Sequence, residues 1–400
     1  MARSLNETKS LTQQNGKFWF YILLILIWGQ HTIFNFIIEV IERLPIIKYF
    51  STMIFPICVM FCIIFSLKYI TKCLSIKDYL FYLFLLFLIF LTMIIYPQNS
   101  QYIEAVFPTL IGAIPLFFVG RCFDIEETKK LLFWLSFISI CFAFLYQAYY
   151  IFTGRTLLSD NMGASYNILP SAMFLIYYAF INKRLFYWIA SFFGIVLEFR
   201  FGTRGPMLSL ALFLAVLICY SILKKKQFYK KVIGIFCVFV VVYILYFSEF
   251  LLDAAIYLSE SFSERGYSTR IFDSFIKGTI TDDSGRGDIY LKIINAIKTS
   301  PFLGYGLFGD RVILGGSYSH NILLEIYCDF GVILGSMIIL TILCVVLRGL
   351  VKNKRYEKKM FLLMMSIMVF VKLSLSWSYL LEPWFFFLLG LCVSTSLERE

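Results

Sequence analysis

One short polar stretch in this mostly apolar sequence contains a histidine suited to proton transfer. The run Tyr318-Ser319-His320-Asn321 stands directly before a long apolar segment. A neutral imidazole can accept a proton near physiological pH, so His320 is a candidate general base. Glu325 and Asp329 follow, four residues apart and so on one face of a helix, where either carboxylate could orient the imidazole. The alternative is an interfacial polar residue at a helix end that Ser319 caps.

A second stretch carries two arginines in a turn between apolar segments, Arg200-Phe-Gly-Thr-Arg204-Gly-Pro-Met-Leu208. Gly205 permits a tight turn, and Pro206 suits the first turn of a helix. The free N–H groups of that helix start, with Arg204 beside them, could bind an anion. The alternative is a pair of arginines that contact lipid headgroups or Glu198.

A third stretch begins with Arg286-Gly-Asp-Ile-Tyr290 and continues to Pro301 and Gly304-Tyr-Gly306. Arg286 is a second candidate for anion binding, and the alternative is a solvated loop arginine. The neighbouring pair Asp282–Asp283 could bind a divalent metal, but with Ser-Gly after it we interpret it as a turn. We predict no metal site and no cofactor.

The composition indicates which elements must hold these residues. The 400-residue chain is 60% hydrophobic and only 15% charged, with 45 phenylalanines, which is not the composition of a soluble domain. The net charge of +11 comes mainly from short basic clusters between apolar segments, so we exclude a nucleic-acid partner. All ten cysteines lie in or beside apolar segments, which favours free thiols over a disulfide framework.

Apolar segments about 20 residues long predict an all-α integral membrane protein of about 12 transmembrane helices. The first is long and lacks a cleavage site, so we interpret it as an uncleaved span. The predicted spans are residues 18–38, 46–67, 79–96, 104–120, 131–152, 166–182, 185–200, 206–223, 231–248, 320–347, 360–380 and 382–397.

The distribution of lysine and arginine predicts cytoplasmic N- and C-termini. With that orientation the inner segments carry 23 basic residues and the short outer loops carry five. The prediction divides the chain into a nine-span bundle (1–248), a large extracytoplasmic loop (249–319) and a three-span bundle (320–400). The loop contains nine acids and seven bases, and its apolar spacing near 289–297 indicates an amphipathic helix.

The three polar stretches together resemble the O-antigen polymerase and O-antigen ligase superfamily of bacterial envelope enzymes. Arg204-Gly-Pro-Met-Leu208 resembles the Arg-x-x-x-Leu motif of that family. Arg286 with Tyr290, Pro301 and Gly304-x-Gly306 resembles its Arg…Trp…Pro…Gly-x-Gly run, with tyrosine in place of tryptophan. His320-Asn321, followed after nine residues by Gly331, resembles its His-Asn-x9-Gly signature.

The resemblance implies a GT-C-like membrane glycosyltransferase in the cytoplasmic membrane, acting on its outer face. Its donor and acceptor would be oligosaccharides on undecaprenyl diphosphate, with a flippase and a chain-length regulator as further partners. It also implies site residues: His320 as base, Asp329 and Glu325 as its orienting acids, and arginines that bind the diphosphate. The candidate diphosphate-binding arginines are Arg204, Arg286, Arg200 and Arg270. The supporting residues are Asn321, Tyr318 and Gly205.

Three functions remain open, and we favour a polymerase that joins repeat units into O-antigen, capsule or exopolysaccharide. A ligase that transfers finished glycan to another acceptor has the same motifs. A lipid-linked sugar flippase or other transporter would show charges at mid-membrane and two similar halves, which this sequence lacks. Arg270 could replace Arg286 as the second family arginine.

Overall fold

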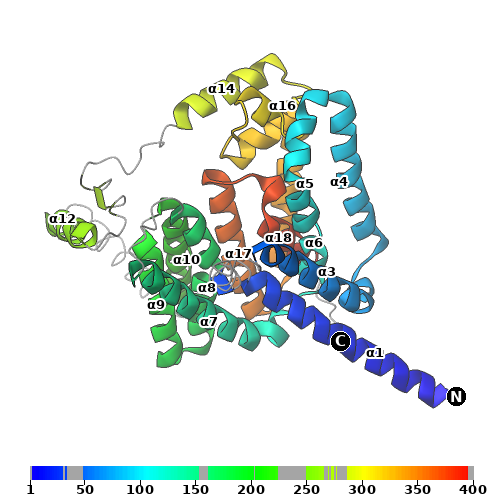
Figure 1. Cartoon of the computed structure of the whole chain (residues 1–400), viewed down its shortest axis with the longest axis horizontal. Coiled ribbons are helices and arrows are strands. Elements are labelled where there is room, and N and C mark those ends of the chain that lie inside the picture. The colour runs from blue at the N-terminus through cyan, green and yellow to red at the C-terminus, as the bar shows by residue number, and fades with distance from the viewer. Residues whose placement is uncertain are drawn as a thin grey trace. The chain divides into compact units, whose positions relative to one another are not determined.

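A computed structural model of the chain describes residues 2–29, 32–33, 48–152, 161–201, 203–223, 249–264, 269, 272–273, 276 and 286–394 (Figure 1). Every regular element in these ranges is helical, which confirms the all-α prediction. The helices are α1 (Ala2–Gly29), α3 (Lys48–Cys73), α4 (Ile76–Ile95), η2 (Pro97–Asn99), α5 (Ser100–Ala113), α6 (Leu116–Cys122), α7 (Ile125–Phe152), α8 (Asn161–Asn182), α9 (Leu185–Phe201), α10 (Arg204–Leu223), α12 (Glu249–Glu264), α14 (Arg286–Thr299), α15 (Gly309–Ile313), α16 (Ile322–Lys352), α17 (Tyr356–Leu375), η3 (Tyr379–Leu381) and α18 (Pro383–Val393).

Within the described residues, five helical stretches are long and apolar enough to cross a membrane. Many of their large apolar side chains are exposed, among them Phe84, Phe87 and Phe90 on α4. Such side chains would contact lipid, which supports an integral membrane protein. The five stretches are Ile76–Ile95, Ile125–Ala148, Met162–Asn182, Arg204–Ile222 and Ile322–Lys352.

The predicted spans 104–120, 360–380 and 382–397 differ from the helices observed, and the second of them is helix α17, which ends at Leu375. The segment 104–120 is divided between α5 and α6. The division falls at Pro115, which has no backbone N–H to donate and disfavours helical geometry in the residue before it. The last span, predicted over 382–397, is the 11-residue helix α18, about 16 Å long and so shorter than a bilayer core. The predicted span 231–248 lies outside the described residues, and the total of twelve remains a prediction.

The chain folds into two compact units that are interleaved in sequence. The first comprises Met1–Gln30, Phe34–Leu135 and Ser284–Glu400, and the second comprises His31–Ile33 and Ser136–Asp283. The predicted loop 249–319 therefore contributes residues to both units. The division into two bundles and a loop remains a prediction about the membrane.

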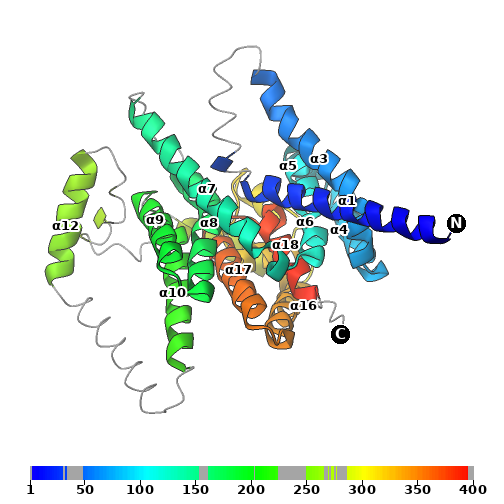
Figure 2. The same ribbon diagram turned by 90° about the horizontal axis from the view of Figure 1, so that it is seen from below.

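In the first unit, α16, α17 and α18 pack against one another, and α6 packs against α18 (Figure 2). The inner side chains of α17 and α18, such as Phe361, Leu362 and Phe387, are buried. Helix α14, which begins at Arg286, lies along α16 (Figure 1). It buries Ile293 and leaves its polar side exposed, as the amphipathic spacing predicts.

A break in α16 receives the loop that carries the Gly-x-Gly motif. Gly331 has φ +72° and ψ 178° inside the helix. The broken ladder is completed by the loop: Tyr305 N donates to Cys328 O at 2.8 Å, and Val332 N donates to Pro301 O at 2.6 Å. A Cβ on Gly304, which has φ +66°, would lie 2.6 Å from the carbonyl oxygens of residues 328 and 329. The motif glycines thus allow backbone to pack on backbone.

In the second unit, α8 forms the core and packs against α9 and α10. Its residues 172–177 are fully buried. The backbone of α9 approaches α8 closely, since a Cβ on Gly194 would lie 3.2 Å from the Cα of Ala172. This core supports the turn between α9 and α10, where Arg204 lies.

Candidate functional site

His320 occupies a backbone conformation that a side-chain-bearing residue seldom adopts. Its φ is +55°, and α16 begins only after it, at Ile322. Of the described non-glycine residues, only His320, Lys183 and Phe308 have positive φ. Strain of this kind persists only where surrounding contacts impose it.

Each neighbour of His320 is anchored. Tyr318 Oη donates to the carbonyl of Ser376 at 2.6 Å, and its ring centroid lies 4.0 Å from that of the imidazole. Ser319 N donates to Asp310 Oδ2 at 2.9 Å. Asn321 Oδ1 accepts hydrogen bonds from Leu323 N and Leu324 N in the first turn of α16, at 2.9 and 3.3 Å. Asn321 is therefore the helix cap, and the expectation that Ser319 caps this helix is wrong, because the Ser319 hydroxyl bonds the Asn321 carbonyl instead.

The electrostatics of this turn favour a neutral imidazole. Burial lowers the pKa of His320, the positive charge of Arg286 lowers it further, and a hydrogen bond with the Ser376 backbone opposes them. Burial also raises the pKa of Tyr318, against the charges of Arg286 and Arg311. Arg286 therefore acts on both rings. The Nδ1 of His320 is buried, and it has no hydrogen-bond partner within the described part of the chain.

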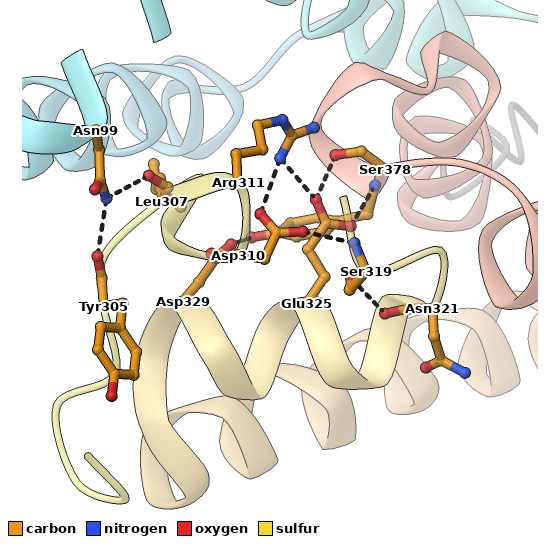
Figure 3. Close-up of polar contacts among 11 residues, drawn as sticks. Asn99, Tyr305, Leu307, Asp310, Arg311, Ser319, Asn321, Glu325, Asp329 and Ser378 are labelled. Carbon is orange, nitrogen blue, oxygen red and sulfur yellow. Dashed lines mark hydrogen bonds and ion pairs between the residues drawn. The ribbon is translucent and has the colours of Figure 1, made fainter. Parts of the chain in front are cut away.

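Beside this turn lies a buried cluster of three acids and one arginine (Figure 3). Arg311 Nη1 lies 3.1 Å from Asp310 Oδ1 and 3.6 Å from Glu325 Oε1. Its guanidinium also lies over two aromatic rings, 4.3 Å from the centroid of Phe308 and 5.8 Å from that of Tyr318. The guanidinium compensates the two carboxylates that it bridges and contacts the ring that stacks on His320.

Glu325 and Asp329 share one buried face of α16, as their spacing predicts. Glu325 accepts hydrogen bonds from the Ser378 hydroxyl and from Tyr379 N, the latter at 3.2 Å. Asp329 Oδ2 accepts from Tyr379 Oη at 2.9 Å. These bonds tie α16 to the segment between α17 and α18. A role for either acid in orienting His320 remains a prediction.

The loop before this cluster is held from the other side by Asn99. Its amide nitrogen donates to the carbonyl oxygens of Tyr305 and Leu307, at 2.8 and 2.9 Å (Figure 3). Asn99 is 1% exposed, so both bonds are shielded from solvent. The loop is therefore fixed at Asn99 and in the break of α16, which sets the position of Asp310 and Arg311.

The second unit contains the other arginine turn. Arg204 is the first residue of α10, and Pro206 lies in its first turn, as predicted. Thr203 Oγ1 donates to Ser165 Oγ at 2.6 Å, and Ser165 donates to the buried carboxylate of Glu198. A Cβ on residue 205 would overlap the hydroxyl oxygen of Tyr166, so a larger residue there would displace that side chain.

The structure brings together part of the predicted site. Arg286, Tyr318, His320, Asn321, Glu325 and Asp329 all lie in the first unit. Arg200, Arg204 and Gly205 lie in the second, and their participation in one site with His320 remains a prediction. Arg270 and the pair Asp282–Asp283 lie outside the described residues.

Sequence reasoning missed Asp310, Arg311, Ser378 and Tyr379. A signal for the first pair was present, because adjacent opposite charges stand between two family motifs in a loop rich in glycine. The second pair lies in the polar and aromatic run Ser376-Trp-Ser-Tyr379, which the predicted span 360–380 concealed. Lys372 at the end of α17 and Glu382 before α18 form an ion pair at 2.6 Å.

Comparison with known families identifies one match. Residues 186–339 match the family model described as O-antigen ligase. The match includes Arg204, Arg286 and His320, the three motifs on which the resemblance rests. No curated protein and no solved structure matches the chain.

Proposed function

We propose that this membrane protein is a polymerase of lipid-linked oligosaccharides, because residues 186–339 match the family model described as O-antigen ligase. It would join repeat units carried on undecaprenyl diphosphate into O-antigen, capsule or exopolysaccharide. The growing chain would move from its lipid onto a new lipid-linked unit.

In the proposed reaction, a hydroxyl oxygen of the acceptor sugar forms a bond to the anomeric carbon of the donor. The bond between that carbon and the diphosphate oxygen breaks, and the lipid diphosphate leaves with the electron pair. His320 accepts the hydroxyl proton. Arg204 and Arg286 stabilise the charge that develops on the phosphate oxygens, so that no metal ion is needed for this purpose.

The observation that carries this proposal is the anchored imidazole of His320, held at positive φ in the turn before α16. A general base must be unprotonated before the reaction, and burial and the positive charge of Arg286 lower the pKa of His320 in that direction. Three anchored neighbours hold the ring in place. A histidine that only capped a helix would need neither feature.

The proposed reaction takes place at the outer face of the cytoplasmic membrane, with both termini in the cytoplasm. The excess of basic residues in the predicted inner segments supports this orientation. A flippase would deliver the lipid-linked units, and a chain-length regulator would act on the product.

The test is deletion of the gene, followed by gel analysis of surface glycan and complementation with wild type or His320→Ala. A polymerase defect leaves single-repeat glycan. His320→Ala should reduce transfer by about 100- to 10,000-fold, the range for loss of a general base, while the protein stays in the membrane at normal level. Normal chain length with His320→Ala would refute the mechanism.

The family model's own description favours a second candidate, a ligase that attaches finished glycan to another acceptor. The same deletion distinguishes the two, because loss of a ligase leaves full-length chains unattached. Accumulation of lipid-linked units on the cytoplasmic face would instead indicate a flippase.

A further inference from the structure

The segment between α17 and α18 exposes one aromatic side chain from an otherwise buried run. Trp377 is 39% exposed, whereas Ser376 and Ser378 on either side are 3% and 2% exposed. Tyr379, which follows, is also buried. Within residues 376–379, only the Trp377 side chain is therefore exposed at the surface.

Both sides of Trp377 are attached to the His320 site. The carbonyl of Ser376 accepts the hydrogen bond of Tyr318, at 2.6 Å, and also bonds the imidazole. On the other side, Ser378 and Tyr379 N donate to Glu325, and Tyr379 Oη donates to Asp329. The backbone at Trp377 is therefore fixed by contacts that also form the candidate site.

The indole is oriented by two further contacts. Its centroid lies 6.1 Å from that of Tyr318 with the ring planes at 72°. The Tyr318 ring in turn contacts the imidazole of His320, with the two planes tilted by 40°. The amine of Lys372 lies 5.4 Å from the indole centroid and is held by its ion pair with Glu382. An edge contact and a cation thus fix the ring. Part of its surface remains exposed, and Tyr318 lies in contact with both the indole and the proposed base.

We propose that Trp377 is a sugar-stacking residue, which packs its exposed indole against the C–H face of a pyranose in the acceptor. This inference rests on the proposed function, since it assigns a subsite for the sugar whose hydroxyl loses its proton to His320. A pyranose has an apolar C–H face and a polar rim of hydroxyls. The electron-rich face of an aromatic ring attracts the C–H face of the sugar and leaves the hydroxyl rim free for hydrogen bonds.

The alternative role for Trp377 is an anchor at the membrane interface, where tryptophan is enriched. The two roles require different properties of the side chain. An anchor needs apolar volume, which leucine also supplies. Stacking needs a flat ring, which phenylalanine supplies and leucine does not.

The experiment measures transfer by the purified full-length protein in nanodiscs, with a lipid-linked oligosaccharide acceptor at varied concentration. Trp377→Leu should raise KM for the acceptor by about tenfold with little change in kcat, which is the size of one aromatic contact. Trp377→Phe should remain close to wild type. The matched control is Trp188→Leu, at a tryptophan that is 40% exposed and lies in the other unit, and it should leave KM unchanged.

Two results would overturn the assignment of Trp377: Trp377→Leu with wild-type KM, or equal rises in KM for the leucine and phenylalanine variants. The His320→Ala variant, measured in the same assay, separates this failure from that of the proposed function. If His320→Ala is inactive while Trp377→Leu is normal, only the sugar subsite is refuted. If His320→Ala transfers normally, the proposed function itself fails.

Discussion

The His320 turn lies in the first unit and the Arg204 turn lies in the second. In each turn, the residue before the histidine or arginine carries a hydroxyl group and is hydrogen-bonded, directly or through a second residue, to a buried acid. Ser319 donates its backbone N–H directly to Asp310. Thr203 reaches Glu198 only through the hydroxyl of Ser165. The carboxylates also differ, because Asp310 is paired with Arg311. Glu198 Oε1 lacks a hydrogen-bond partner in the described ranges.

This difference indicates two ways to hold a reactive side chain. The His320 turn is fixed through backbone bonds, a charge pair and an aromatic stack, so its geometry tolerates little change. The Arg204 turn is joined to Glu198 through side-chain hydroxyls, which can reorient at low cost. Substitutions of matched chemistry in the two turns should therefore have unequal effects.

The largest difference is expected from replacing each of the two acids by its amide. Asp310→Asn leaves the buried Arg311 with only Glu325, at 3.6 Å, and should lower the free energy of unfolding by about 3 to 4 kcal/mol. Glu198→Gln keeps an oxygen acceptor for Ser165 and should cost about 1 kcal/mol. Thermal unfolding of both purified variants measures the effects. Equal melting temperatures would remove the proposed contrast.

A smaller difference is expected from adding one methyl group in each unit. Gly304→Ala forces a Cβ onto the backbone of α16 at positive φ and should cost about 2 to 3 kcal/mol. Gly205→Ala meets only the tip of the Tyr166 side chain, which can turn aside, and should cost about 1 kcal/mol. Gly315→Ala is the control for conformation alone, since φ there is +64° and nothing lies within 4 Å of the added carbon. Thermal unfolding ranks the three variants. A Gly304→Ala variant no less stable than the control would contradict the close packing of the Gly304 backbone on the backbone of α16.

Arg286→Gln should lower the transfer rate at every pH, since it removes a proposed diphosphate-binding arginine. The smallest effect is the displacement of its pH profile, which is compared after each rate is divided by its maximum. A general base works when unprotonated, so the transfer rate should fall on the acidic side as His320 takes up a proton. Removal of the Arg286 charge eases that protonation and raises the pKa, so the acidic limb should move to higher pH. Lys298→Gln, at the far end of α14, is the control and should leave the profile in place. A shift toward lower pH in Arg286→Gln would contradict the assignment.

Several features of the fold and the site follow from the sequence. Apolar segment lengths predict the all-α membrane class, and the five candidate spans agree with it. The spacing of Glu325 and Asp329 predicts their common face, and the spacing of apolar residues predicts the amphipathic helix that begins at Arg286. These features are local and depend on helical periodicity alone.

The remaining features depend on contacts between distant segments. Nothing near Asp310 in the sequence shows that its carboxylate would bind Ser319 N, nor that Tyr379 would bind Asp329 fifty residues before it. The sequence shows a glycine at position 331 but does not show that the helix breaks there. The break becomes evident only from the hydrogen bonds that the loop beginning at Pro301 makes with α16. Such bonds fill the donors and acceptors of an interrupted helix, and only the fold determines which segment supplies them.

The most direct test of the proposed mechanism, in which Arg204 binds the diphosphate and His320 accepts the proton, is a double-mutant cycle on the transfer rate. Residues that act as a unit are not additive, so the Arg204→Ala/His320→Ala protein should transfer at about the rate of the slower single variant. If the two losses multiply instead, the two residues act independently, which contradicts the proposed mechanism.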